Sequence, residues 1–457
     1  MKKPVLKIFS LILAVSIMVS LAACGGSNQN GSSSTTGSNA TGGESTAAQT
    51  SSADEKVTLS IMNMFPNTAT DGNSIAFRKM LEQFKTENPN ITINEEALNS
   101  NTYETKIATV AAGNQLSDIF VFKGSMLKEF INNGLIQPVD DVLNADPAWK
   151  SQFYEGIFND FVTDGKTYGI PFQKLDTHLI FYNEKMFSDA GITSFPKTWA
   201  DFVSAIDKLK AKGITPIVMG NKDNWVAESC MLSTLGDRFT GTDWFNSIKN
   251  KGGAKFTDPE FVTALKTMQD LAKMGAFNSD INTIDNAQQK TNYYNGKAAM
   301  FMEGNWAISS VIHDAPKDIL DNTGVAILPS VDGGKGDPNA DSAGAAWAYN
   351  VSAKLGGAQK TAAFKLIKAV TDSKYSAEAI ANSAIPASKA EVDSSTVPPL
   401  FNKYLELSAT LKPVPIYDSQ LPADLIQVMN TGLQDLMAGN TTPEALAKKI
   451  QAAYENE

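Results

Sequence analysis

The sequence predicts an α/β fold made of two lobes, and two observations support this prediction. Signals for strands and helices alternate along most of the chain, which is the pattern of α/β folds. The chain has 457 residues, more than one hydrophobic core usually supports, so two lobes are expected. A leader and a polar segment occupy residues 1–53, and the lobes are therefore built from the rest of the chain.

The predicted strands are short runs of apolar or alternating residues bounded by polar ones. They lie at residues 57–62, 91–94, 119–122 and 298–302. The run at 119–122 is apolar throughout, which is typical of a parallel strand covered on both faces. His178 also falls in an apolar run, and we expect it to be a buried histidine of the core.

The predicted helices combine an apolar face with a start or stop signal. They lie at residues 75–84, 125–134 and 198–212, from 259 onward, and at 358–371 and 421–437. Ser125 is expected to cap the second of these helices. Thr198 with Asp201 predicts a cap for the third, and Pro259 fits the first position of the fourth.

The N-terminal segment, residues 1–24, is interpreted as a lipoprotein signal peptide. Three lysines begin it, and residues 8–19 form an apolar run too short to span a bilayer comfortably. The run ends in Leu-Ala-Ala-Cys. We therefore expect the signal peptide to be cleaved before Cys24, so that Cys24 becomes the new N-terminus and carries a lipid such as palmitate. An ordinary secretory signal peptide is the alternative.

Residues 25–53 are interpreted as a disordered tether. They are almost entirely Gly, Ser, Thr, Asn, Gln and Ala, without apolar periodicity. A flexible chain of this length has an end-to-end distance of roughly 30 Å. We expect a lipid on Cys24 to hold the protein at the extracellular face of a single-membrane bacterium. A periplasmic lipoprotein is the alternative location.

The charge and the cysteines exclude some partners. The formal net charge is −10 and the basic residues do not cluster, which argues against nucleic acid as a partner. With Cys24 assigned to the lipid, Cys230 has no second cysteine, so no disulfide framework is predicted. Cys230 lies in an apolar stretch and is expected to be a small buried hydrophobe.

The sequence does not favour an enzyme. The two histidines, His178 and His313, lack a metal-ligand spacing, and neither a Gly-x-Ser-x-Gly elbow nor a phosphate-binding Gly-Lys-Ser/Thr loop is present. Acid pairs such as Asp140-Asp141 are explained as surface residues of an acidic protein. We therefore predict neither catalytic residues nor a metal or cofactor.

Three tryptophans stand beside glycine and small polar residues in predicted turns. Trp306 follows the strand at 298–302, Trp347 lies among small residues, and Trp225 ends the polar segment 221–225. A sugar presents a C–H face to an aromatic ring and hydroxyl groups to polar side chains at its edge. These tryptophans therefore indicate a carbohydrate site, and ordinary core packing is the alternative.

From about Lys56 to the C-terminus, the chain resembles the extracellular solute-binding proteins of ABC importers, in the carbohydrate-binding branch that includes maltose-binding protein. The resemblance is carried by four groups of segments in matching order. They are residues 164–172 with 179–185 and 196–199, residues 295–300 with 304–306, residues 324–329, and residues 384–389.

The resemblance implies a two-lobed periplasmic-binding-protein-like fold of type II, with a ligand cleft between lobes that are joined by crossing strands. The chain is expected to cross near 173–176, 345–348 and 388. Lobe one would comprise residues 54–172 and 349–388. Lobe two would comprise residues 173–348 and 389–457.

The resemblance also implies a set of ligand-binding residues. Trp306 matches a sugar-stacking tryptophan, Trp225 another cleft aromatic, and Asp176 an acid that accepts hydroxyl groups. The full set is Phe65, Asn67, Phe122, Lys123, Asp176, Trp225, Glu303, Asn305, Trp306, Trp347, Tyr417 and Asp418. Gly124-Ser125 replaces an acidic-basic pair of the maltose site, and residues 421–427 lack its late aromatic. Tyr417-Asp418 just upstream is a candidate substitute for that aromatic. These departures argue against maltodextrin itself and leave the sugar class standing.

The implied function is that of the substrate-binding component of an ABC sugar importer. A monomer would capture a mono- or oligosaccharide by hinge closure and deliver it to membrane permease subunits. One alternative is the same scaffold binding a polyamine, a metal chelate or a glycerol phosphate ester. The phosphate version is weakened because Arg78 and Arg238 are the only arginines. The other alternative is a surface lipoprotein hydrolase or adhesin.

Overall fold

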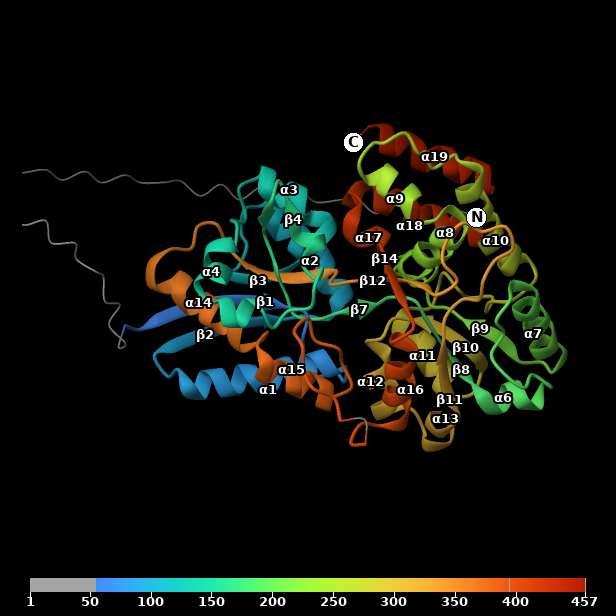
Figure 1. Cartoon of the computed structure of the whole chain (residues 1–457), viewed down its shortest axis with the longest axis horizontal. Helices are drawn as coiled ribbons and strands as arrows, with labels where there is room; N and C mark the ends of the chain where they lie inside the picture. Colours follow the sequence, from blue (N-terminus) through green and yellow to red (C-terminus); the bar gives the residue numbers. More distant parts are fainter. Residues whose placement is uncertain (1–54, 394, 457) are drawn as a thin grey trace, which may run out of the picture. The chain divides into compact units, whose positions relative to one another are not determined.

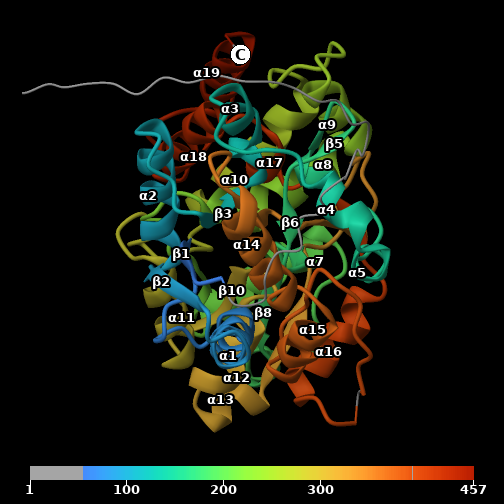
Figure 2. The ribbon, with the colours of Figure 1, turned by 90° about the vertical axis from the view of Figure 1, so that its left-hand side faces the viewer.

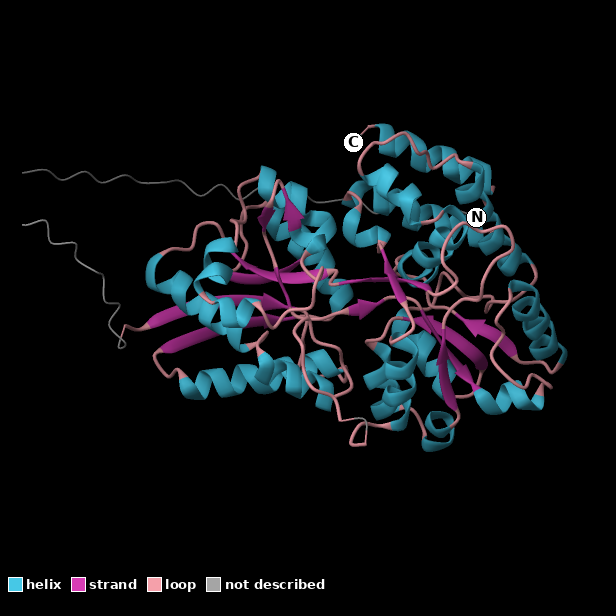
Figure 3. Ribbon diagram, viewed as in Figure 1, coloured by secondary structure: helices cyan, strands magenta, loops and turns pink. Residues whose placement is uncertain are grey.

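The computed structural model describes residues 55–393 and 395–456 (Figure 1). The expectations for the signal peptide, for lipid on Cys24 and for the tether fall on residues outside this part of the chain. The described residues form two α/β lobes, each with its own sheet (Figure 3). Within the described residues, no helix has the length and apolar character needed to cross a membrane.

Lobe one is built on a five-stranded sheet with the order β2-β1-β3-β13-β6. Its first three strands are parallel, whereas β13 runs antiparallel to both of its neighbours. The strands are β1 (Val57–Asn63), β2 (Ile91–Ala97), β3 (Ile119–Lys123), β6 (Ile170–Pro171) and β13 (Trp347–Val351). All five residues of β3 are buried, because strands flank it and helices cover the sheet.

The helices of lobe one lie on both sides of this sheet. α1 and α15 pack together on one side, and α2 and α3 lie on the other (Figure 1; Figure 2). The helices are α1 (Gly72–Glu87), α2 (Ser100–Ala112), α3 (Leu127–Asn132), α4 (Asp140–Ala145), α5 (Pro147–Lys150), α14 (Gly357–Ala369) and α15 (Ser373–Ala381). Two 3₁₀ turns (Gly124–Met126 and Asn159–Phe161) and the small hairpin of β4 (Val162–Thr163) and β5 (Lys166–Thr167) complete the lobe.

Lobe two contains a four-stranded sheet with the order β11-β8-β10-β9. The strands are β8 (Leu179–Asn183), β9 (Thr215–Val218), β10 (Ala298–Glu303) and β11 (Thr323–Ala326). Helices and a π-helical turn surround this sheet. They are α6 (Glu184–Asp189), α7 (Trp199–Ala211), the π turn (Glu228–Leu232), α8 (Ser233–Thr240), α9 (Thr242–Lys249), α10 (Pro259–Lys273), α11 (Asn286–Tyr294), α12 (Ala307–Asp314), α13 (Lys317–Asp321), α16 (Pro399–Ser408), α17 (Tyr417–Gln420), α18 (Ala423–Met437) and α19 (Pro443–Glu455).

A third sheet lies where the chain passes between the lobes. It has the order β14-β12-β7, with β7 (Leu175–Asp176), β12 (Ala340–Gly344) and β14 (Lys412–Val414). The chain leaves the sheet of lobe one through β7 and returns to it between β12 and β13. Isolated bridges at Gln173 and Ser388 lie at the other expected crossings. The boundaries predicted for each lobe stay a prediction, and β13 begins two residues before the predicted start of the second lobe-one segment.

Most predicted elements are confirmed. The four predicted strands are β1, β2, β3 and β10, and predicted helices correspond to α1, α7, α10, α14 and α18. Thr198 caps α7, because its hydroxyl accepts the Asp201 amide hydrogen at 3.2 Å. The buried position of Cys230 is also as expected.

The helix predicted from Ser125 to residue 134 is wrong in its start and in its cap. Ser125 lies inside a 3₁₀ turn, and α3 extends only over Leu127–Asn132. The amide of Gly124 donates to the carbonyl of Ala346 at 3.0 Å. A Cβ at Gly124 would collide with the backbone of Ser419. These long-range contacts hold the turn in place, and local capping propensity is overridden.

His178 is a satisfied core histidine, as predicted. Nε2 accepts the amide hydrogen of Leu328 at 3.0 Å, so Nδ1 carries the proton and donates to the carbonyl oxygen of Cys230. The residue is fully buried. Burial lowers the pKa of His178 to about 4, and the charge of Arg238 acts in the same direction.

This lowered pKa predicts a loss of stability in mild acid. The unfolded chain takes up a proton on His178 as the pH falls below about 6.5, while the folded chain does not. At pH 5 the loss is about 2 kcal/mol in the free energy of unfolding. Urea denaturation at pH 7.5 and pH 5 should show this extra loss in the wild type and not in His178→Gln. Equal pH dependence in the two proteins would contradict it.

Candidate functional site

A cavity of about 610 Å³ is lined by residues of both lobes. This volume lies within the range of small-molecule binding sites. Lobe one contributes the segments that follow β1 and end β3, and lobe two contributes the segment that follows β10. Ligands of α/β sheets usually bind outside the carboxyl ends of strands, and the cavity has this location.

Trp306 enters the cavity from the end of β10 and is held by a buried carboxylate. Its Nε1–H donates to Oε1 of Glu303 at 2.6 Å. The other carboxylate oxygen accepts from Gln289 at 2.9 Å and also from Asn286. A Cβ at Gly304 would collide with the Trp306 ring, so the glycine allows this close turn. These contacts fix the orientation of the indole.

Burial raises the pKa of the Glu303 carboxyl, whereas the charge of Lys290 and the donated hydrogen bonds lower it. Such a group is stable inside a protein only when its oxygens have partners. Glu303 has three donors, and one of them is the tryptophan that lines the cavity. One of the hydrogen bonds that compensate the burial of this acid therefore also fixes the position of Trp306.

Trp225 and Trp347 line the cavity from different lobes. The ring of Trp225 lies beside that of Trp306 with centroids 6.1 Å apart and planes tilted by 51°. Trp347 begins β13 in lobe one and is 7% exposed. The Lys123 ammonium lies 5.7 Å from the centre of its ring. All three indoles line the cavity, as an aromatic corner in lobe two and a single ring in lobe one.

Lys123 lines the cavity and is largely buried. Its Nζ donates to Asp418 at 2.8 Å and to Glu104 at 3.1 Å. Asp418 belongs to α17, so this buried ion pair joins β3 of lobe one to lobe two. Burial alone would lower the pKa of Lys123, but the two carboxylates outweigh it and raise the pKa.

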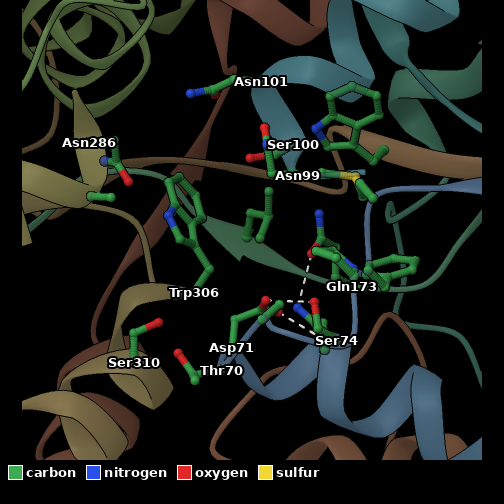
Figure 4. A pocket seen from close by; sticks show the side chains of 18 of the residues that line it. Thr70, Asp71, Ser74, Asn99, Ser100, Asn101, Gln173, Asn286, Trp306 and Ser310 are labelled. Atoms are coloured by element: carbon green, nitrogen blue, oxygen red, sulfur yellow. Dashed lines mark hydrogen bonds between the residues drawn. The ribbon is translucent and has the colours of Figure 1, made fainter. Parts of the chain in front are cut away.

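The rest of the wall is rich in amides and hydroxyls, as expected for a ligand with many hydroxyl groups. Figure 4 shows Asn99, Ser100 and Asn101 on one side of Trp306 and Thr70 and Ser310 on the other. Amides and hydroxyls offer donors as well as acceptors, so they can match groups that do both.

Several contacts join the two lobes around this wall. Asn101 donates to Asp223 at 2.7 Å, and Thr70 donates to Asp314 at 2.9 Å. The backbone carbonyl of Thr70 also accepts the hydroxyl hydrogen of Ser309 at 3.1 Å. The wall is therefore shared by the two lobes at both of these positions.

Six of the twelve predicted site residues line the cavity. They are Phe65, Lys123, Trp225, Trp306, Trp347 and Asp418. Their roles toward a ligand stay predictions. They come from six separated segments of the chain, which the crossings between the lobes bring together.

The other six lie outside the wall. Phe122 is buried against Phe130 and Phe161, because successive residues of β3 face opposite sides. Tyr417 stacks on Phe245 with centroids 4.6 Å apart. Asn67 is exposed.

Asp176, Glu303 and Asn305 support the wall from behind. Asp176 accepts a hydrogen bond from Tyr404, and its backbone carbonyl accepts the Asn305 amide hydrogen at 2.9 Å. The Asn305 side chain donates to the Lys174 carbonyl at 3.0 Å. Glu303 holds the Trp306 indole, as described above.

Polar residues at two helix starts line the cavity although they are not among the predicted site residues. Asp71 and Asn99 are the N-caps of α1 and α2, and both line the cavity. Their position before an amphipathic helix is a signal that sequence analysis can find. That these caps face the ligand cavity follows only from the fold. Gln173, at a predicted crossing, also lines the cavity.

Among the described residues, no group of three or more histidine, cysteine or acidic side chains could hold a metal ion. Glu228 lies near Asp418, and its carboxyl is fully buried. Burial raises the pKa of Glu228, and the negative charge of Asp418 raises it further.

The model of the family described as bacterial extracellular solute-binding protein matches residues 71–377. A curated relative, an uncharacterized ABC transporter extracellular-binding protein of Pyrococcus horikoshii, is 25% identical over 284 residues. The match covers 61% of this chain and 62% of that relative. For a binding protein of Brucella abortus, the chain spans 59% of the relative's length.

Two solved structures match over nearly their whole length. A chitin oligosaccharide binding protein has a TM-score of 0.80 and 27% identity, covering 88% of this chain and 98% of the other. A structure from a study of xylan utilization by the thermophilic bacterium Caldanaerobius polysaccharolyticus has a TM-score of 0.78 and 28% identity. It covers 87% of this chain and 99% of the other. The predicted two-lobed fold and the resemblance to solute-binding proteins are confirmed.

The buried ion pair predicts unequal effects of removing its members. Lys123→Met leaves the buried carboxylate of Asp418 unpaired and should lower the free energy of unfolding by about 3 kcal/mol or more. Glu104→Gln removes a half-exposed partner and should cost under about 1 kcal/mol. Urea denaturation of both variants measures the difference. A small effect of Lys123→Met would show that the pair contributes little.

Proposed function

We propose a function for this chain, which belongs to the bacterial extracellular solute-binding protein family. Our proposal is that it binds a mono- or oligosaccharide in the cavity between its lobes. It would deliver this sugar, as a monomer, to the permease subunits of an ABC importer. The extracellular-binding relative of an ABC transporter and the two glycan-related structures support this proposal.

The fixed indole of Trp306 is the observation that carries the sugar assignment. A sugar ring stacks its C–H face on an indole and directs its hydroxyls sideways to polar groups. Trp306 has its own N–H engaged by Glu303, so its face is presented in one orientation. Trp225 beside it extends the aromatic surface, and Asn286, Asn101 and Ser100 line the cavity around these two rings.

Capture is proposed to combine binding with closure of the lobes. Trp347 and Lys123 belong to lobe one, whereas Trp306 and Trp225 belong to lobe two, so a ligand between them contacts both. A ligand that contacts both lobes stabilises the closed arrangement over the open one. In this proposal the sugar leaves unchanged, because the family consists of binding proteins and the wall is used for hydrogen bonding and stacking.

We also propose that Cys24 carries a lipid and that residues 25–53 tether the lobes to the outer face of the membrane. The small residues before Cys24 and the polar composition of the tether support this proposal. Mass spectrometry of the mature N-terminus would test it, and an unmodified Cys24 would contradict it.

Replacing the stacking indole should weaken binding. Trp306→Ala should cost roughly 1–3 kcal/mol, which corresponds to about 5- to 150-fold in the dissociation constant. Isothermal titration calorimetry with the sugar that the thermal-shift screen below identifies measures the change in the dissociation constant. Trp199→Ala is the matched control, because Trp199 packs on Phe202 away from the cavity. Unchanged affinity in a folded Trp306→Ala variant would remove Trp306 from the site.

The ligand class can be found by a thermal-shift screen of the purified chain. A ligand that binds the folded state at about 100 times its dissociation constant adds about 2.7 kcal/mol of stability. Oligosaccharides, monosaccharides, polyamines and glycerol phosphates should be compared. We expect a shift with one family of sugars. A shift only with a charged solute would retain the fold and contradict the sugar assignment.

A further inference from the structure

We infer that the cavity selects against glycans that carry acidic groups and accepts neutral glycans and those with an amino group. This inference rests on the proposed sugar-binding function. It follows from two features of the cavity wall. Its charged side chains are paired within the protein, and the helix N-termini of α1 and α2 are capped by their own side chains.

Lys123, one of the two lysines that line the cavity, is more than neutralised. Lys123 is paired with Asp418 at 2.8 Å and with Glu104 at 3.1 Å. Two carboxylates therefore surround one ammonium group. An acidic substituent placed here would have to compete with both carboxylates for the same donor, in a partly buried place where like charges repel strongly.

The remaining charges of the wall have the same balance. Besides Lys123 and its two carboxylates, the charged residues that line the cavity are Asp71, Asp314 and Lys290. The charge of Lys290 acts on the buried carboxyl of Glu303, whose pKa it lowers. The wall therefore contains four carboxyl groups and two ammonium groups. The carboxyl groups belong to Asp71, Glu104, Asp314 and Asp418, and the ammonium groups to Lys123 and Lys290.

The arginines, which suit carboxylate and phosphate groups best, are used elsewhere. Arg78 donates to Glu95 at 2.9 Å on lobe one. Arg238 is buried and donates to the backbone carbonyls of Asp337 and Leu328. Neither residue lines the cavity.

The starts of α1 and α2, whose N-cap residues line the cavity, are also filled. A helix N-terminus binds anions through its free N–H groups. At α1 the carboxylate of Asp71 already accepts from the Ser74 amide at 2.9 Å, and it adds a negative charge of its own (Figure 4). At α2 the side chain of Asn99 accepts from the Thr102 amide at 3.0 Å. An incoming anion would have to displace these caps.

A series of matched glycans tests the inference by calorimetry on the purified chain. Neutral xylo-oligosaccharides are compared with the same chains bearing a glucuronic acid branch. Oligosaccharides of N-acetylglucosamine are compared with their de-N-acetylated forms. In the xylo-oligosaccharide series we expect the acidic member to bind at least tenfold more weakly than its neutral counterpart. An amino member should bind at least as tightly as the neutral one.

The dependence on salt identifies the cause. Raising the salt from about 0.01 M to about 1 M shortens the screening length from about 30 Å to about 3 Å. The penalty for the acidic glycan should shrink, because it arises from repulsion. A penalty that is constant over this range would assign the discrimination to shape, and would overturn the inference.

Variants localise the repulsion. Glu104→Gln combined with Asp314→Asn removes two carboxylates from the wall and should reduce the penalty about tenfold. Glu82→Gln combined with Asp207→Asn makes the same change in net charge at exposed positions outside the wall and should leave the penalty unchanged. Circular dichroism checks folding, and the salt series on the wild type applies even where a variant fails to fold.

The outcomes separate this inference from the function on which it rests. Acidic glycans that bind as tightly as neutral ones, or more tightly, would overturn the charge selection and leave sugar binding intact. Failure of every sugar in the thermal-shift screen, neutral ones included, would overturn the sugar function and the charge selection with it.

Discussion

The passage of the chain between two separate sheets is the constraint on which the site depends. The strands β7, β12 and β14 pair with one another at this passage, so the backbone there has its hydrogen bonds satisfied. Because β3 of lobe one and β10 of lobe two end beside it, side chains from both lobes meet at one cavity. Lys123 and Asp418 are 295 positions apart in the chain and are still paired. Without these crossings the wall would be divided between two unrelated surfaces.

Buried acids position the groups that face the cavity. Burying a carboxylate is unfavourable unless donors or a cation compensate it, and a compensated carboxylate holds its partners in one geometry. Glu303 does this for Trp306, and Asp418 does it for Lys123. The side chains that would contact a ligand are thus oriented before it arrives, which reduces the entropic cost of binding.

Much of the candidate site could be predicted from the sequence, but the residues behind it could not be distinguished from those that line it. Trp306 is predicted because it follows a strand beside glycine and small polar residues, whereas Lys123 is implied only by the resemblance to solute-binding proteins. Phe122 was grouped with Lys123, although alternation along β3 places its ring in the core. The caps Asp71 and Asn99 were missed because a helix start carries no local sign that it faces a cavity. Ser125 was misassigned because contacts from Ala346 and Ser419 shape its turn.

The sequence by itself determined the alternation of strands and helices, the helix caps and the small residues around the tryptophans. These properties are local, because periodicity and capping depend on residues a few positions apart. Only the tertiary structure decided which side chains share the cavity and how its charges are paired. That outcome depends on contacts between segments more than a hundred residues apart, such as the pairing of Lys123 with Asp418 and of Asn101 with Asp223. Local patterns contain no information about which distant segment will meet them.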